Sequence, residues 1–315
     1  MMFIHEIPEA KQLFTLVANE KDIDPYLIEK DYWITHVLWG LQQQGINFEL
    51  KGGTSLSKGY RIIERFSEDL DIKIYPKDNS SVKTGVNHQK PEHIKSRQAF
   101  FDGLARSIKI PGILATRDYD FDDQKSMRNA GIRLIYDTLF EPVIGVKLGV
   151  LLEVGFDQTT PHNSINFSSW IHDKMQIYPQ IDVVDNKAYN VLCYCPEYTF
   201  VEKLQTISTK VRLQQETGVF PANFLRHFYD IYKLLEQDIV INFIGTKEYL
   251  SHKDKRFRSK DNKDLTKNLA FNLEKDSNLY NLYKKEFEKI VNLFYNKKPT
   301  FDEIYGTIIQ YRNRL

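Results

Sequence analysis

LKGGTSLSKGYRIIERFSEDLDIK, residues 50–73, contains the two sequence patterns from which the fold of this chain is predicted. The first is a diglycine, Gly52 and Gly53, between a short apolar run and a segment of about residues 54–64 with helical character. The second is the alternation of Asp69 and Asp71 with apolar residues, which predicts a strand that also includes Ser67. The stretch therefore predicts a strand, a turn, a helix and a second strand in that order.

The diglycine turn is predicted to bind phosphate. Glycine has no Cβ, so the backbone can turn tightly and a bulky anion can approach it. The N–H groups of Thr54 and Ser55 are then expected to point out of the N-terminus of a helix, where phosphate is favoured. A Gly-Gly pair alone is more often only a turn, and a Walker-type ATP site is excluded because GGTSLSKG lacks the Gly-Lys-Ser/Thr ending. The predicted nucleotide-binding residues are Gly52, Gly53, Thr54, Ser55 and Ser67.

The two aspartates are predicted to hold a divalent cation. Side chains alternate along a strand, so Asp69 and Asp71 share one face while Leu70 and Ile72 point to the other. Two carboxylates among apolar residues repel each other unless a cation or a base neutralises them. Oxygen ligands suit Mg²⁺, with Mn²⁺ as an alternative ion. Solvated aspartates are the simpler interpretation of this pair alone, and the neighbouring diglycine favours the metal site.

Three segments of the chain resemble one protein family. They are IEKDYWITHVL (residues 28–38), ELKGGTSLSKGY (49–60) and RFSEDLDI (65–72). Together they resemble the AbiEii/AbiGii toxin family of nucleotidyltransferases, within the DNA polymerase β-like superfamily. The GG[ST] turn and the D-x-D strand of that family match this chain at residues 52–54 and 69–71.

The resemblance implies an α+β fold, in which a polymerase β-like nucleotidyltransferase core has a mixed sheet flanked by helices and is followed by a C-terminal helical bundle. The expected division is a core domain over residues 1–195 and a helical domain over residues 196–315 that contributes Lys203 and Asp230 to the cleft. A chain of 315 residues is long enough for two such domains. The likeness ends near residue 235, so the resemblance implies no role for the residues that follow.

The clearest strand in the sequence is predicted over residues 143–156, VIGVKLGVLLEVGF, where apolar residues alternate without a break. Glu153 falls on the opposite face, and a carboxylate in so apolar a strand needs a partner or a cation. In the superfamily that the chain resembles, a third carboxylate from a neighbouring strand completes the metal site, and Glu153 is the candidate by that resemblance. A salt bridge from Glu153 to Lys147 or Lys73 is the alternative.

The helical half contains a second pattern of the family, an E-K pair on one helix and an R-H-x-x-D run on the next. It matches Glu202 and Lys203, and RHFYD at residues 226–230. By this resemblance Lys203 contacts triphosphate oxygens, and Asp230 positions Lys203, the acceptor or a water. The alternatives are that Lys203 extends from an apolar stripe to water, and that Arg226 and Asp230 form an i,i+4 ion pair.

The resemblance further implies a metal-dependent enzyme that transfers a nucleoside monophosphate from an NTP to RNA, with tRNA as the first choice of acceptor. Its role would be that of the toxin of a type IV toxin–antitoxin or abortive-infection pair in phage defence, with a cognate antitoxin encoded nearby. Transfer of a nucleotidyl or phosphoryl group to a protein or small molecule, and a non-catalytic nucleotide- or RNA-binding module, are the alternatives. The catalytic residues would be Asp69, Asp71, Lys203 and Asp230, and the metal ligands Asp69, Asp71 and Glu153.

Composition and charge limit the classes of protein to consider. A hydrophobic fraction of 42% and an aromatic fraction of 13% indicate a folded chain. Lys and Arg (43) balance Asp and Glu (42), so a nucleic-acid partner would have to be held by a local patch. Without a signal-peptide pattern or an apolar run of about 20 residues, we expect a cytoplasmic protein with no membrane contact. Cys193 and Cys195 are then expected to be buried, reduced thiols.

A long helix is predicted to start at Pro25, with Asp24 as its N-cap. The charged run EKD at residues 29–31 lies within it and is interpreted as a solvated face in preference to a direct catalytic role.

A second charged segment, residues 247–267, is rich in Lys and Arg, with Tyr249 and Phe257 between them. Basic side chains contact phosphates and aromatic rings stack on exposed bases, so this segment is either part of an RNA-acceptor surface or a solvated loop.

Overall fold

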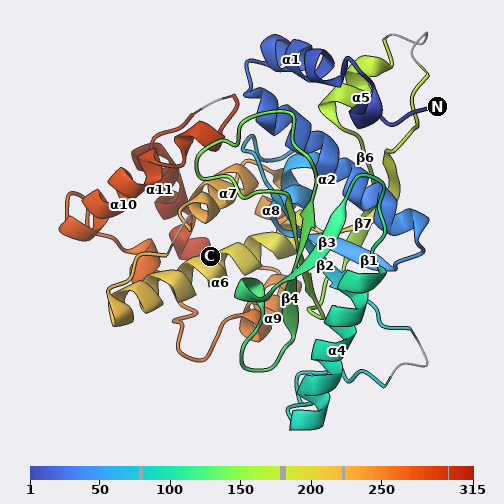
Figure 1. Cartoon of the computed structure of the whole chain (residues 1–315). Coiled ribbons are helices and arrows are strands. Elements are labelled where there is room, and N and C mark those ends of the chain that lie inside the picture. The colour runs from blue at the N-terminus through green and yellow to red at the C-terminus, as the bar shows by residue number, and fades with distance from the viewer. Residues whose placement is uncertain (78–80, 178–181, 222–223, 297) are drawn as a thin grey trace. The chain divides into compact units, whose positions relative to one another are not determined.

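The computed structural model describes residues 1–77, 81–177, 182–221, 224–296 and 298–315. Contacts between residues divide this part of the chain into two compact units. The first consists of residues 1–59 and 67–194, and the second of residues 60–66 and 195–315. Figure 1 labels many of the helices and strands of both units. The second unit is therefore discontinuous in sequence, because a short segment beside the diglycine belongs to it.

The first unit is built on a seven-stranded mixed sheet with the strand order β3-β4-β5-β2-β1-β7-β6. Its strands are β1 (Phe48–Lys51), β2 (Asp69–Ile74), β3 (Leu114–Asp118), β4 (Asn129–Ile135), β5 (Val150–Gly155), β6 (His162–Phe167) and β7 (Ala188–Tyr194). Strand β1 pairs with β2 antiparallel and with β7 parallel, and β2 pairs with β5 parallel. The mixed sheet, with helices before, between and after its strands, confirms the expected α+β class.

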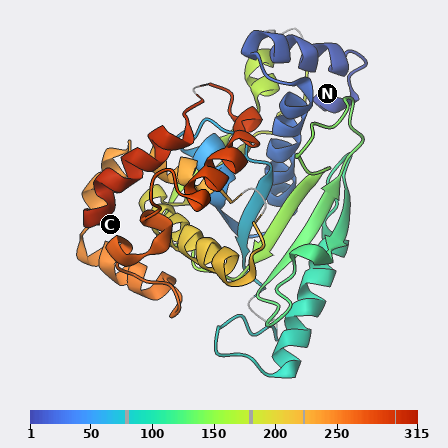
Figure 2. The ribbon, with the colours of Figure 1, turned by 90° about the vertical axis from the view of Figure 1, so that its left-hand side faces the viewer.

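Helices cover this sheet. They are η1 (Ile4–Glu6), α1 (Ala10–Lys21), α2 (Pro25–Gln43), α3 (Gly52–Thr54), the π-helical turn η2 (Ser55–Gly59), α4 (Pro91–Ser107), η3 (Tyr119–Phe121) and α5 (Trp170–Met175). Figures 1 and 2 both show α4 lying along the sheet beside β3, with which it is in contact. Helices α1 and α5 both pack on α2. The predicted start of α2 is confirmed, because Pro25 is its first residue and the Asp24 side chain accepts a hydrogen bond from the N–H of Tyr26.

The strand register separates an apolar face of the sheet from a polar one. On the apolar face Leu50 lies opposite Ile72, and Ile72 lies opposite Val154. All three side chains are buried. One residue along each strand, the register places Lys51 opposite Asp71 and Asp71 opposite Glu153. Residues directly opposite each other point to the same side of a sheet, so the charged residues share the second face.

Two predicted elements are shorter than expected. The strand predicted over residues 143–156 is reduced to β5, because Gly145 and Gly149 have φ values of +86° and +63° and interrupt the extended backbone before Val150. The helix predicted over residues 54–64 ends at Gly59, because Arg61 has a left-handed φ of +56°. Ser67 was expected on the second strand, but it lies two residues before the start of β2.

The second unit is helical. Its elements are α6 (Pro196–Thr217), α7 (Arg226–Leu234), α8 (Asp238–Phe243), α9 (Lys247–Arg256), η4 (Leu265–Lys267), η5 (Leu269–Phe271), α10 (Asn278–Glu288), η6 (Val291–Leu293), α11 (Phe301–Tyr311) and η7 (Arg312–Arg314). Helix α6 is central, since α7, α8 and α9 all contact it. The segment 60–66 joins this unit through the N–H of Phe66, which donates to the carbonyl of Leu293 at 2.7 Å.

None of the helices in the described part of the chain combines the length and the apolar composition needed to cross a membrane. Both cysteines are free thiols and both are buried, as expected.

Candidate active site

The diglycine turn packs directly against the aspartate strand. Gly52 has a φ of +78°. A Cβ atom on Gly52 would lie 2.9 Å from Cγ of Asp71 and closer still to its Oδ2. Only glycine meets both conditions, a left-handed backbone and an approach that leaves no room for a side chain. The sequence pattern GG…DLD is therefore one structural unit, in which the turn makes space for a carboxylate.

The hydroxyl groups after the diglycine stabilise this unit. Thr54 is fully buried, and its Oγ1 donates to the main-chain oxygen of Asp69 at 2.5 Å. Both the N–H and the hydroxyl of Ser55 donate to the carbonyl of Gly52. The N–H of Ser55 was expected to point out of a helix end, but the chain forms a tight turn here and uses this donor internally. Ser67 is buried just before β2.

The three predicted metal ligands lie on the same face of the sheet. Asp71 and Glu153 are directly opposite each other on neighbouring strands, and Asp69 is two residues before Asp71. Asp69 is buried, and its Oδ1 has no hydrogen-bond partner among the residues that the structure describes. Within the described ranges, however, no three His, Cys, Asp or Glu side chains are arranged as a group that could hold a metal ion. The metal-binding role of these carboxylates stays a prediction.

The other oxygen of Asp69 has a cationic partner. Nζ of Lys147 lies 2.6 Å from Oδ2 of Asp69. Lys73, the other lysine considered as a partner for Glu153, lies 3.8 Å from Glu49. Each lysine thus has another carboxylate as a neighbour. The sequence predicted Lys147 only as a possible partner of Glu153. Its contact with Asp69 could not be predicted, because the distance from Lys147 to β2 depends on the turn that precedes β5.

A small cavity opens beside Asp71 and Glu153. Its volume is about 170 Å³, and Lys51, Arg128 and Asp157 are among the residues that line it. Oδ2 of Asp157 lies 3.4 Å from Nζ of Lys51, and its Oδ1 lies 3.8 Å from Nη2 of Arg128. The cavity is smaller than the ~300 Å³ at which small-molecule sites begin. Its size suits an ion or a single phosphate group, and its lining has charges of both signs.

The charged run at residues 29–31 is buried, so its interpretation as a solvated face was wrong. Glu29 accepts hydrogen bonds from the hydroxyl of Thr138 and the N–H of Leu139. Lys30 pairs with Glu68 at 3.2 Å. A buried charge needs a partner. The three buried charged residues of α2 find their partners in three different segments of the first unit.

Asp31, the third member of this run, forms an ion pair with Lys58 of η2 and accepts from the N–H of Trp170 at 2.8 Å. It thus connects the turn after the diglycine to the start of α5.

The lysine and aspartate predicted in the helical half lie side by side. Nζ of Lys203 on α6 is 2.7 Å from Oδ2 of Asp230 on α7. Arg65 binds the same carboxylate with both of its ends, Nε to Oδ1 at 2.7 Å and Nη2 to Oδ2 at 2.8 Å. The alternative of an Arg226–Asp230 pair is not what the structure contains, since Arg65 and Lys203 are the cations at this carboxylate. Arg65 lies in the family-like segment RFSEDLDI, but nothing in the sequence connects it to α7.

Burial and charge act in opposite directions in this cluster. Burial by itself would raise the pKa of Asp230, but Arg65 and Lys203 hold it below its usual range. Burial lowers the pKa of Lys203, and Asp230 offsets part of that effect. Burial and the nearby Lys203 hold the pKa of His227 well below its ordinary value. His227 is therefore neutral at pH 7 and accepts from Lys203 across 3.4 Å.

The aromatic residues of the basic C-terminal segment are not available for stacking on RNA bases. Tyr249 on α9 and Phe257 just after it are both buried. Lys253 is also buried and donates to the main-chain oxygen of Leu315. Part of this segment thus belongs to the core of the second unit. The excess of Lys and Arg in the segment had predicted an exposed surface instead.

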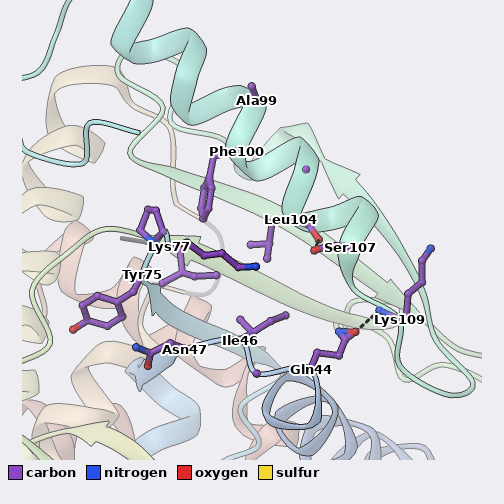
Figure 3. A pocket seen from close by; sticks show the side chains of 14 residues that line it. Gln44, Ile46, Asn47, Tyr75, Lys77, Ala99, Phe100, Leu104, Ser107 and Lys109 are labelled. Atoms are coloured by element: carbon purple, nitrogen blue, oxygen red, sulfur yellow. Dashed lines mark hydrogen bonds between the residues drawn. The ribbon is translucent and has the colours of Figure 1, made fainter. Parts of the chain in front are cut away.

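A large cavity in the first unit contains none of the predicted site residues. It has a volume of about 1050 Å³ and lies between α4, the end of β2 and the turn after α2. Figure 3 shows Phe100 and Leu104 of α4 pointing toward Ile46 and Lys77. Ile74 on its lining belongs to the apolar face of β2, opposite to Asp69 and Asp71. We assign this cavity no part in the chemistry of the carboxylates.

The α+β core, the diglycine turn against β2 and the carboxylates in register on β2 and β5 are the features of a nucleotidyltransferase-like core. A family described as "Nucleotidyl transferase AbiEii toxin, Type IV TA system" matches residues 36–307 of the chain. Because the match extends over most of the 315 residues, the chain belongs to this family, as its sequence motifs indicated. Membership implies a toxin with a cognate antitoxin. No curated protein and no solved structure matches the chain.

Proposed function

We propose that this chain is a Mg²⁺-dependent enzyme, with Mn²⁺ as an alternative ion, that transfers a nucleoside monophosphate from an NTP to RNA, with tRNA as the first choice. The observation that supports it best is the shared face of Asp69, Asp71 and Glu153, together with the buried, unpartnered Oδ1 of Asp69. A buried carboxylate oxygen without a donor is costly in a finished fold and is expected where a ligand completes the site. Action in the cytoplasm, abortive infection and phage defence belong to the same proposal.

In this proposal Asp69, Asp71 and Glu153 hold the metal. The bound ion would supply charge stabilisation at the transferring phosphoryl group. The main chain of Gly52, Gly53 and Thr54 is proposed to contact phosphate oxygens, and Ser55 and Ser67 are the remaining predicted contacts.

The reaction is an in-line displacement. A hydroxyl oxygen of the acceptor forms a bond to the α-phosphorus, the bond from this phosphorus to the bridging oxygen of the β-phosphate breaks, and pyrophosphate leaves. The hydroxyl proton passes to solvent. Lys203 is proposed to contact triphosphate oxygens, and the 2.7 Å contact from Asp230 keeps its ammonium oriented.

The test is a labelling experiment with the purified chain and an Asp69→Ala/Asp71→Ala variant. Each protein is incubated with Mg²⁺, total RNA and each α-³²P-labelled NTP in turn, and the products are resolved on a gel. We expect label in an RNA band with the wild type alone, and the size of the band would identify the acceptor class. Label in protein or in a small molecule would replace the RNA acceptor. Absence of any nucleotide binding would reject the enzyme proposal.

A further inference from the structure

Lys147 occupies the one oxygen of Asp69 that has a partner. Its Nζ lies 2.6 Å from Oδ2, while Oδ1 of the same carboxylate is buried without a hydrogen bond. The Lys147 side chain is 28% exposed, whereas that of Asp69 is 9% exposed. The ammonium therefore reaches the carboxylate from the solvent side, and its flexible stem can swing away without opening the core.

The main chain of Lys147, unlike its side chain, is fixed on both sides. Its N–H donates to Oε2 of Glu68 at 2.6 Å. Its carbonyl accepts from Nζ of Lys30 and from the hydroxyl of Tyr26, the latter at 3.4 Å. Glu68 is the residue immediately before Asp69. The backbone that bears the ammonium is thus attached to the backbone that bears the carboxylate.

The groups that hold Lys147 form a buried ion pair. Lys30 and Glu68 are 3.2 Å apart, and their side chains are 0% and 7% exposed. Removing two charges from water costs free energy that a single contact does not repay without further hydrogen bonds. Here those bonds go to both polar main-chain groups of Lys147. A fold that uses a buried ion pair to fix one loop residue indicates that the position of this residue matters.

The turn around Lys147 depends on two glycines. Gly145 and Gly149 have φ values of +86° and +63°. A Cβ on Gly149 would lie 3.2 Å from the carbonyl carbon of Leu134 and would overlap its oxygen. The ring of Phe121 also lies 4.7 Å from Nζ of Lys147, a distance at which an aromatic face attracts an ammonium. The ammonium thus contacts the ring of Phe121 and the carboxylate of Asp69 at the same time.

We propose that Lys147 neutralises Asp69 while no metal is bound, and that its ammonium moves to the phosphate oxygens of the nucleotide when the metal binds. This inference rests on the proposed function. A divalent cation at Asp69 repels an ammonium a few ångströms away, and a triphosphate attracts it. Lys147 is then a substrate-binding residue, and its competition with the metal delays loading of the site until nucleotide is present.

The first experiment measures binding of Mn²⁺ alone by electron paramagnetic resonance. Lys147→Gln removes the competing ammonium, so we expect Mn²⁺ to bind about three- to tenfold more tightly than to the wild type. Lys73→Gln removes the same charge from β2 near Glu49 and is the matched control, expected to leave Mn²⁺ affinity within about twofold. Lys147→Arg keeps the charge and is expected to bind Mn²⁺ as the wild type does.

The second experiment measures binding of inorganic triphosphate at saturating Mg²⁺ by calorimetry. Lys147→Gln is expected to bind it about tenfold more weakly, since one charged contact to phosphate is lost. Lys147→Arg and Lys73→Gln are expected to stay close to the wild type. Opposite shifts for the metal and for triphosphate in one variant are the result that a merely structural lysine would not produce.

Two outcomes would overturn the inference in different ways. If Lys147→Gln and Lys73→Gln behave alike in both measurements, Lys147 neither competes with the metal nor binds triphosphate. The proposed function still stands in that case, provided that the Asp69→Ala/Asp71→Ala variant no longer binds Mn²⁺. If that double variant binds Mn²⁺ as the wild type does, the metal site itself is wrong and both proposals fall. Near-ultraviolet circular dichroism checks folding, and Lys147→Met replaces the Gln variant if the latter does not fold.

Discussion

Gly52 connects the chemistry of a single residue to the geometry of the site. Its left-handed backbone starts the turn, and the absence of a side chain lets Asp71 lie against it. The backbone conformation belongs to the turn, and the missing space is due to Asp71 on the paired strand β2, directly beside the glycine. The effect of a methyl group at this position can therefore be predicted from local geometry.

We expect Gly52→Ala to inactivate the enzyme. The left-handed φ costs about 1–2 kcal/mol of free energy of unfolding, and the methyl group displaces the Asp71 carboxylate. A displacement of about 1 Å at a reacting centre lowers nucleotidyl transfer by about 100-fold. Urea unfolding and the radiolabel assay measure the two effects separately.

Gly45→Ala is the control for this variant. Gly45 also has a left-handed φ, +64°, but nothing lies within 4 Å of the position of an added Cβ. It should lose a similar free energy of unfolding and retain its activity. Equal activity of the two alanine variants would show that the approach of Gly52 to Asp71 is unimportant.

Helix α2 is the element that organises the first unit. Its buried charges at residues 29–31 hold the segments around Thr138, Glu68 and Trp170. One turn further on, His36 is buried as a neutral ring. Its Nε2 donates to the carbonyl of Pro111 at 2.9 Å, and its Nδ1 accepts from the side-chain amide of Asn186 at 2.8 Å. A second proton on the ring would break the bond to Asn186.

The stability of the first unit is expected to fall on acidification because of His36. Burial lowers the pKa of His36 to about 4, from 6.5 in an unfolded chain. Between these values the unfolded state binds more protons, so stability is full above about pH 6.5 and falls as the pH drops toward 4. From pH 7 to pH 5 the loss is about 2 kcal/mol. All three tryptophans, Trp33, Trp39 and Trp170, lie in this unit, so urea unfolding followed by their fluorescence measures it.

His36→Gln is the matched variant, because its amide can still donate to Pro111 and does not titrate. Its stability should change about 2 kcal/mol less than that of the wild type over the same pH interval. Parallel pH profiles of the two proteins would mean that other groups account for the acid sensitivity.

The chain as a whole is not divided at one point in its sequence. Residues 60–66 leave the first unit between the diglycine turn and β2 and belong to the second. Arg65 attaches this segment to the second unit, since its buried guanidinium binds both oxygens of Asp230. The second unit therefore needs a segment from the N-terminal half of the sequence to complete its own charge cluster.

Removal of Arg65 is expected to destabilise the second unit. In Arg65→Met the fully buried Asp230 keeps only Lys203 as a cationic partner, and loss of one member of a buried ion pair costs about 3–5 kcal/mol. Hydrogen exchange should show faster exchange of the amides of α7. The control is Arg226→Met, which removes the arginine one helical turn before Asp230 and should leave this exchange unchanged. Faster exchange in Arg226→Met and unchanged exchange in Arg65→Met would instead support the alternative i,i+4 pair of Arg226 and Asp230.

Local rules predicted much of the site. The diglycine, the alternation of Asp69 and Asp71, and the start of α2 at Pro25 are patterns within a few residues, and each was found where it was predicted. The same rules failed for the run at residues 29–31, because a charged helix face is solvated or buried according to what packs on it. They also failed beyond Gly59, where contacts with the helical unit determine the path of the chain.

The sequence by itself determined the fold class, the family and the pairing of a glycine turn with two aspartates, since these depend on backbone geometry and on residues close together in the chain. Only the tertiary structure decided which charges meet. Lys147 reaches Asp69 from 78 residues away, and Arg65 reaches Asp230 from 165 residues away. Charges act through space and are strengthened by burial, so their partners depend on how the strands and helices pack and not on their spacing in the sequence.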